Sequence, residues 1–125
     1  MYTLGIDIGS SSSKTVILKD GKRILAHVVV PLGTGTVGPE KAFAEIFKQS
    51  GIAQDQIAYT VATGYGRLIC PDANAQISEL SCHAKGIHLL LPQVDTIIDI
   101  GGQDAKALTI SSQGKLTAFQ MNDKC

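Results

Sequence analysis

The sequence predicts an α/β fold in which one glycine-containing turn is used twice. The segments DIGSSSSK, from Asp7 to Lys14, and DIGGQDAK, from Asp99 to Lys106, share an Asp-Ile-Gly start and a lysine at their last position. Apolar, β-prone residues precede and follow both segments, as expected of strands that flank a hairpin turn. Two segments with apolar residues at helical spacing lie between the turns. The chain of 125 residues is long enough to bury a core.

The repeat extends beyond these two turns to a whole three-stranded meander. The hairpin turn KDGK at residues 19–22 has its counterpart in SQGK at residues 112–115. The offset between the copies is 92 residues at the aspartates and 93 residues at the glycines of these second turns. A nearly constant offset indicates a duplicated structural unit. We therefore expect a complete N-terminal subdomain over residues 1–94 and, over residues 95–125, the opening meander of a second subdomain that is cut short.

The first copy continues beyond its meander into helices and a further strand. Pro39 suits the first position of a helix, where its missing N–H costs nothing, and Gly51 is a natural helix end. A second helix, roughly Ala75–Leu91, has apolar residues at helical spacing and ends before Pro92. The expected strands of this subdomain are Tyr2–Asp7, Thr15–Leu18, Arg23–Val30 and Ile57–Ala62.

The second copy is expected to contain three strands joined by two turns. Its strands are Thr96–Ile100, Ala105–Ser111 and Leu116–Met121. The segment GGQD at residues 101–104 forms the first turn and SQGK the second, because glycine accepts the positive φ angles of tight turns.

Bulk composition argues against several functional classes. The formal net charge is zero, so there is no electrostatic basis for a nucleic-acid or membrane partner. No apolar run approaches the length of a membrane span, and the N-terminus lacks the pattern of a signal peptide. Three cysteines without close pairing, Cys70, Cys82 and Cys125, are typical of a reducing, cytoplasmic protein rather than a disulfide scaffold.

An aspartate at the end of a buried strand, followed by glycine, places a carboxylate next to main-chain N–H groups. The carboxylates of Asp7 and Asp99 suit Mg²⁺, usually through water, and the small residues let backbone donors approach phosphate oxygens. Two such turns facing each other would hold the β- and γ-phosphates of a nucleotide from both sides. The two turns contain neither the GxxxxGK[ST] of a P-loop nor the GxGxxG of a dinucleotide fold.

A glycine-rich hairpin that ends a strand is common, and for either turn alone a purely structural role is favoured. Their matching places in a duplicated meander favour a functional role instead. In this layout the sequence resembles the actin-like (RNase H-like) nucleotide-binding fold of actin, hexokinase and Hsp70-type proteins. Within that resemblance, DIGSSSSK is the first phosphate loop and DIGGQDAK is the second.

Three further segments narrow the resemblance to one family. They are ATGYGR (residues 62–67), SELSCHAKG (residues 78–86) and IDIGGQD…FQMNDKC (residues 98–125). In these segments the chain resembles the ATPase activators (component A) of 2-hydroxyacyl-CoA dehydratases and the ATP-hydrolysing subunits of benzoyl-CoA reductase. The likeness covers the whole chain, which corresponds to the N-terminal half of such a protein.

The resemblance implies an ATPase coupled to electron transfer. Its implied ligands are ATP or ADP and Mg²⁺, and its implied redox cofactor is an oxygen-sensitive [4Fe–4S] cluster shared by a homodimer. Each subunit of that dimer supplies two cysteines, and Cys125 corresponds to the first of them. The implied electron acceptor is a 2-hydroxyacyl-CoA dehydratase or a related reductase. The activity would belong to the full-length protein, and this chain alone is expected to be inactive.

The expected site residues fall into three groups. Catalytic roles are expected of Asp7, Gln103 and Asp104, and the resemblance implies that the last two orient a water molecule. The expected phosphate contacts are Gly9, Ser10, Ser11, Ser12, Ser13, Lys14, Gly101, Gly102 and Gln103. The expected metal-binding residues are Asp7 and Asp99, for Mg²⁺ through water, and Cys125, for the cluster.

Alternatives stay open for several residues and for the activity. Lys14 could reach a phosphate or lie along the strand pair, and Arg67 could contact a phosphate or a partner, or be an ordinary surface arginine. Cys82 and His83 suggest a metal site, but packing of their helix against a sheet is favoured; Cys70 is expected in a loop. A small-molecule kinase of the same fold and a non-catalytic nucleotide-binding switch are the alternative functions.

Overall fold

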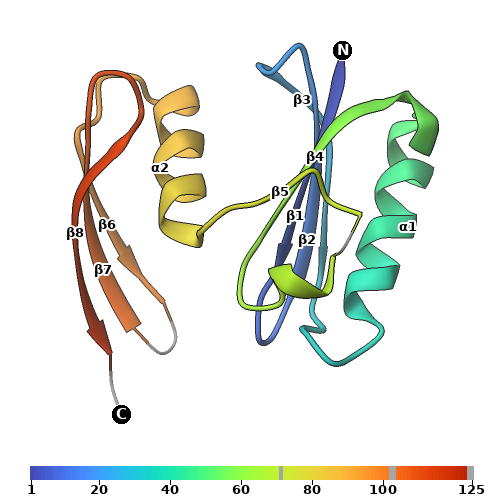
Figure 1. Ribbon diagram of the computed structural model, residues 1–125, viewed down its shortest axis with the longest axis horizontal. Coiled ribbons are helices and arrows are strands. Elements are labelled where there is room, and N and C mark those ends of the chain that lie inside the picture. The colour runs from blue at the N-terminus through green and yellow to red at the C-terminus, as the bar shows by residue number, and fades with distance from the viewer. Residues whose placement is uncertain (71, 102–103, 124–125) are drawn as a thin grey trace. The chain divides into compact units, whose positions relative to one another are not determined.

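The computed structural model describes residues 1–70, 72–101 and 104–123 (Figure 1). The chain divides into two compact units, Met1–Ile77 and Ser78–Cys125. In the described residues the first unit contains a five-stranded sheet, in the order β3-β2-β1-β4-β5, and the second a three-stranded sheet, β6-β7-β8. The α/β class is therefore confirmed. The predicted subdomain boundary between residues 94 and 95 is drawn from the sequence repeat, whereas the compact units meet between residues 77 and 78. The boundary of the repeat stays a prediction.

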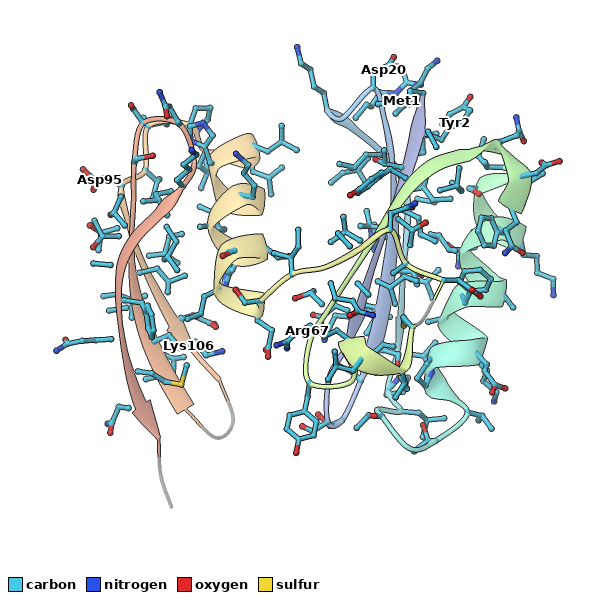
Figure 2. The ribbon with its side chains drawn as sticks, viewed as in Figure 1. Met1, Tyr2, Asp20, Arg67, Asp95 and Lys106 are labelled. Carbon is cyan, nitrogen blue, oxygen red and sulfur yellow. The ribbon has the colours of Figure 1, made fainter. Side chains whose placement is uncertain are left out.

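The first sheet opens with the expected meander. Its strands β1 (Tyr2–Ile8), β2 (Ser13–Lys19) and β3 (Arg23–Val30) are antiparallel neighbours. At the β2–β3 turn Asp20 and Gly21 have φ angles of 55° and 70°, as the Asp-Gly pair predicts. The Met1 ammonium group lies 2.8 Å from Asp20 Oδ1 at the same end of the unit (Figure 2). Strands β4 (Ile57–Thr63) and β5 (Ala75–Gln76) extend the sheet parallel to β1.

Helix α1 (Gly38–Ser50) covers one face of this sheet (Figure 1). Pro39 lies in its first turn, and Gly51 ends it with a φ of 72°. Around Ile46 of this helix pack the buried strand residues Leu4, Ile6, Ile8, Ile17 and Val28. Because Leu4, Ile6 and Ile8 take every second position of β1, the intervening Asp7 lies on the opposite face of the sheet.

Helix α2 (Glu79–Leu90) begins four residues later than the sequence predicts. Ala75 and Gln76, expected in the helix, pair with β4 as the short strand β5. Ser78 then caps the helix, because its Oγ accepts a hydrogen bond from the Ser81 N–H. The apolar spacing was correct for the helix, but it could not reveal that the preceding residues complete a sheet.

The second unit repeats the meander with strands β6 (Thr96–Ile100), β7 (Asp104–Ile110) and β8 (Leu116–Asp123). Strand β7 starts at Asp104, although the sequence predicts a turn over residues 101–104. Helix α2 packs on one face, where its Ala84 is buried with Ile97, Leu108 and Ile110. In the described parts of the chain no helix is long and apolar enough to cross a membrane.

The other face of the second sheet is apolar and exposed. Ile98 and Ile100 are 72% and 79% exposed, whereas their counterparts in the first meander, Ile6 and Ile8, are buried beneath α1. The two meanders therefore share strand order and register but differ in which face a helix covers.

Candidate functional site

The carboxylate of Asp7 lies near the end of β1, on the face of the sheet opposite α1. Asp7 is paired in register with Lys14 of β2, and Lys14 Nζ lies 3.4 Å from Asp7 Oδ2. The side chains are 42% (Lys14) and 40% (Asp7) exposed, so this ion pair contributes only about 0–1 kcal/mol. The lysine lies along the strand pair, and its ammonium group could leave the carboxylate for a phosphate at small cost.

The loop after β1 is held against the segment that follows β3. Within the loop the Gly9 N–H donates to Ser12 O at 2.8 Å, and Gly9 O accepts from the Thr34 N–H at 2.9 Å. A Cβ at Gly33 would overlap the carbonyl groups of Gly9 and Ser10, so this close approach needs glycine. The backbone of the loop is therefore fixed by the protein itself.

The four serines of this loop differ in accessibility. Ser10 and Ser11 are exposed, Ser12 is half-buried and Ser13 is buried. The Ser13 hydroxyl donates to Leu32 O at 2.8 Å, so it supports the loop instead of facing solvent. Of the phosphate contacts expected here, the exposed serines are accessible to a ligand and the Ser13 hydroxyl is not.

A second glycine turn, at the end of β4, lies against Asp7. Gly64 has a φ of 89°, and a Cβ there would come within 3.0 Å of Asp7 Oδ1 and of Ile8 O. The Gly66 N–H donates to Ile8 O at 2.8 Å. Arg67 Nη1 donates to Gly64 O at 3.1 Å, so the guanidinium group is engaged within this turn (Figure 2). The glycines of ATGYGR therefore allow the chain to pass close to the first carboxylate, a role that the sequence did not reveal.

The second turn repeats the first in its strand pairing. Asp99 of β6 is paired in register with Lys106 of β7, as Asp7 is with Lys14. Gly101 follows β6 and is exposed. The other expected contacts of this turn, Gly102 and Gln103, lie outside the described residues, and of Asp104 only the backbone, in β7, is described.

The Asp99 carboxylate has a neighbour that the sequence did not link to it. His83 Nδ1, on α2, lies 3.8 Å from Asp99 Oδ2, and the two side chains are 34% and 36% exposed. From the sequence, His83 is considered only together with Cys82, as a metal site that is less favoured than packing of their helix against a sheet. No spacing rule connects a residue of a helix with one in the following strand, so periodicity carried no signal for this contact.

The described residues contain no group of three or more His, Cys, Asp or Glu side chains that could hold a metal ion. Single carboxylates still fit Mg²⁺, which binds proteins through one or two carboxylates together with water and phosphate oxygens. Asp7 and Asp99 are therefore suited to the ion that the resemblance implies.

The cysteines of the described residues do not form a cluster site. Cys70 and Cys82 are free, half-buried thiols, and Cys125 lies outside the described residues. Cys70 follows a short 3₁₀ turn and packs against the first core, and burial raises the pKa of its thiol. Two separate thiols cannot supply the four thiolates of a [4Fe–4S] cluster.

Two meanders, each with an aspartate paired in register with a lysine at a glycine turn, are typical of the actin-like fold. The sequence profile of the BadF/BadG/BcrA/BcrD ATPase family matches residues 4–125. The chain belongs to this family, as its sequence segments predict.

Similar proteins agree in sequence and in structure. The activator of lactoyl-CoA dehydratase from Anaerotignum propionicum is 61% identical over 125 residues, which are 100% of this chain and 48% of that protein. The structure of the activator of the 2-hydroxyisocaproyl-CoA dehydratase from Clostridium difficile, solved with bound ADPNP, is 52% identical in sequence and has a TM-score of 0.92. The match covers 100% of this chain and 47% of the chain in that structure. The structure of component A of the (R)-2-hydroxyglutaryl-CoA dehydratase from Acidaminococcus fermentans is 51% identical in sequence and has a TM-score of 0.93. This match covers 100% of this chain and 48% of the chain in that structure. The chain thus spans about half the length of these relatives.

Proposed function

We propose that this chain is the N-terminal half of an ATP-hydrolysing activator of a 2-hydroxyacyl-CoA dehydratase or a related acyl-CoA reductase, acting in the cytoplasm. Three relatives that are 51–61% identical over the whole chain carry such names. The exposed apolar face around Ile98 and Ile100 supports the same proposal, because a longer protein would have further elements to cover it.

The observation that carries the proposal is the repeated Asp–Lys pair, Asp7 with Lys14 and Asp99 with Lys106. Both aspartates would take part in binding one Mg–ATP, through the water shell of the ion. Bound Mg²⁺ supplies charge neutralisation at the β- and γ-phosphates. In the first turn, the exposed Ser10 and Ser11 would offer hydroxyl and main-chain N–H groups to phosphate oxygens. In the second turn, Gly101, Gly102 and Gln103 would offer main-chain N–H groups.

The catalytic step needs a group that orients the attacking water. The sequence segment GGQD contains Gln103 and Asp104, whose side chains are of types that hold water by hydrogen bonds. Their assignment rests on the family resemblance. Replacement of Gln103 by alanine should lower the rate of ATP hydrolysis more than it weakens nucleotide binding.

Hydrolysis would drive transfer of a low-potential electron to the partner enzyme. The resemblance assigns Cys125 to a [4Fe–4S] cluster that two subunits share, with the second cysteine of each subunit outside this sequence. A two-fold axis makes four thiolates from two cysteines per chain. Such a cluster supplies one-electron transfer, and nucleotide-dependent motion of the two subunits would alter its access to the acceptor.

The test is an anaerobic preparation of the whole protein, compared with its Cys125→Ser variant. We expect ATP hydrolysis, about four irons per dimer and electron transfer to the dehydratase, with iron lost in the variant. ATP hydrolysis without iron in either protein would refute the electron donor and leave a nucleotide-binding switch. A phosphorylated small molecule as product would establish the kinase instead.

A further inference from the structure

The contact between His83 and Asp99 joins helix α2 to the second phosphate turn. Ala84, the next residue of α2, is buried against Ile97 and Leu108, and this packing fixes the position of the helix on the sheet. The position of His83 beside β6 is therefore set by the core of the unit. Its Nδ1 lies 3.8 Å from Asp99 Oδ2.

The two phosphate turns differ at this point. In the first, Asp7 Oδ1 lies against Gly64, which has no side chain and whose φ of 89° brings the backbone close. In the second, a histidine side chain approaches the equivalent carboxylate. Both residues of the pair are about one-third exposed, so a ligand can reach the carboxylate while the imidazole stays beside it.

A partly exposed pair of this kind contributes little to folding, but its position has a chemical consequence. An imidazole N–H that donates a hydrogen bond to one carboxylate oxygen leaves the other oxygen available as an acceptor. The 3.8 Å separation is longer than a hydrogen bond, so the two side chains must approach each other for that bond to form. Asp99 Oδ2 would then be held, which leaves the other oxygen for a water molecule on Mg²⁺.

We propose that His83 is a positioning residue for Asp99. His83 holds the Asp99 carboxylate in the orientation that receives the water shell of nucleotide-bound Mg²⁺. The inference rests on the proposed function, because it concerns the same Mg–ATP. His83 contacts neither the ion nor the nucleotide. Its removal should weaken binding of the divalent ion more than binding of the nucleotide itself.

Binding of the ion is measured directly with Mn²⁺ in place of Mg²⁺. Electron paramagnetic resonance counts the free Mn²⁺ as it is titrated into the whole protein with ADPNP, and no catalysis is involved. The His83→Ala variant should bind Mn²⁺ about tenfold more weakly, as is typical when a group that orients a metal-binding residue is lost. The His83→Gln variant should recover part of this loss, since its amide N–H can still donate to the carboxylate.

Lys85→Ala is the matched control on the same helix. The Lys85 side chain is exposed and its Nζ lies 3.4 Å from Gln113 O, away from Asp99, so Mn²⁺ binding should not change. A parallel titration of Mg²⁺ during ATP hydrolysis should show a raised half-saturating Mg²⁺ concentration in His83→Ala, with the KM for ATP at saturating Mg²⁺ within about twofold of wild type.

The outcomes separate the two proposals. Normal Mn²⁺ binding by a folded His83→Ala variant, or tighter binding, would overturn the positioning role while the proposed ATPase stands. If His83→Ala does not fold, His83→Phe, which keeps the bulk of the ring and cannot donate, takes its place. Weak Mn²⁺ binding by a folded His83→Phe variant then supports the positioning role, and normal binding overturns it. Wild-type protein that binds no Mn²⁺–ADPNP would overturn both proposals.

Discussion

Replacement of Gly64 by alanine tests the close packing of the β4 turn against the first carboxylate. Gly64 has a φ of 89°, and an added Cβ would come within 3.0 Å of Asp7 Oδ1 and of Ile8 O. The new methyl group must therefore displace the carboxylate, the strand end or the turn. We expect a loss of stability in the first unit and a displaced Asp7 side chain.

Two contributions set the size of this loss. A left-handed conformation costs a non-glycine residue about 1–2 kcal/mol. Forcing a methyl group into a filled site costs about 1–3 kcal/mol more. Gly35 separates the two contributions, because its φ is 79° but no atom lies within 4 Å of an added Cβ. Gly35→Ala should cost about 1–2 kcal/mol and Gly64→Ala about 2–5 kcal/mol.

Urea unfolding followed by tyrosine fluorescence measures both variants. The protein contains no tryptophan, and its three tyrosines, Tyr2, Tyr59 and Tyr65, all belong to the first unit, so the signal reports on that unit. The difference between the two midpoints, at equal m values, gives the contribution of the contact with Asp7 and Ile8. Equal losses in Gly64→Ala and Gly35→Ala would show that the turn does not press on the carboxylate.

Three further predictions concern the core, a surface ion pair and a thiol. In this chain, Ile8→Ala should cost about 2–5 kcal/mol because Ile8 is fully buried, whereas Ile100→Ala, at the equivalent but exposed position, should change thermal stability little. The ammonium group of Met1 lowers the pKa of Asp20 below its ordinary value of 3.8. The stabilisation that Asp20 provides is therefore present above pH 3.8 and is lost as the pH falls through the lowered pKa of the folded state. The stability difference between wild type and Asp20→Asn, from urea midpoints at falling pH, should therefore shrink in acid; a constant difference would contradict the pairing. Burial raises the pKa of Cys70, so iodoacetamide should alkylate it slowly at neutral pH and faster after unfolding, as mass spectrometry of the labelled peptides would show.

Local sequence signals predicted most of the fold. Apolar, β-prone runs and the KDGK hairpin turn placed β1 to β3, and Pro39 and Gly51 marked the ends of α1 to within one residue. The predicted start of α2 was wrong because Ala75 and Gln76 fit a helical pattern but find hydrogen-bond partners in β4. Pairing with a distant strand depends on tertiary structure, which periodicity in one segment does not contain.

The sequence repeat predicted the aspartates of the candidate site. It did not predict the contacts that those aspartates make with other elements. The repeat gave Asp7 and Asp99 equivalent places at two turns, and in the folded chain each aspartate is paired in register with the lysine of its own segment. Two contacts were missed, Gly64 against Asp7 and His83 against Asp99. Each joins residues that only the folded chain brings together.

The rate of ATP hydrolysis by the whole protein with one carboxylate removed at a time tests the central claim most directly. The Asp7→Asn and Asp99→Asn variants keep the size of each side chain and remove its charge. If both turns bind one Mg–ATP, each variant should lower kcat/KM by about tenfold or more while the circular dichroism spectrum is unchanged. A folded variant of either kind with the wild-type kcat/KM would contradict the claim that the repeated turn serves one nucleotide.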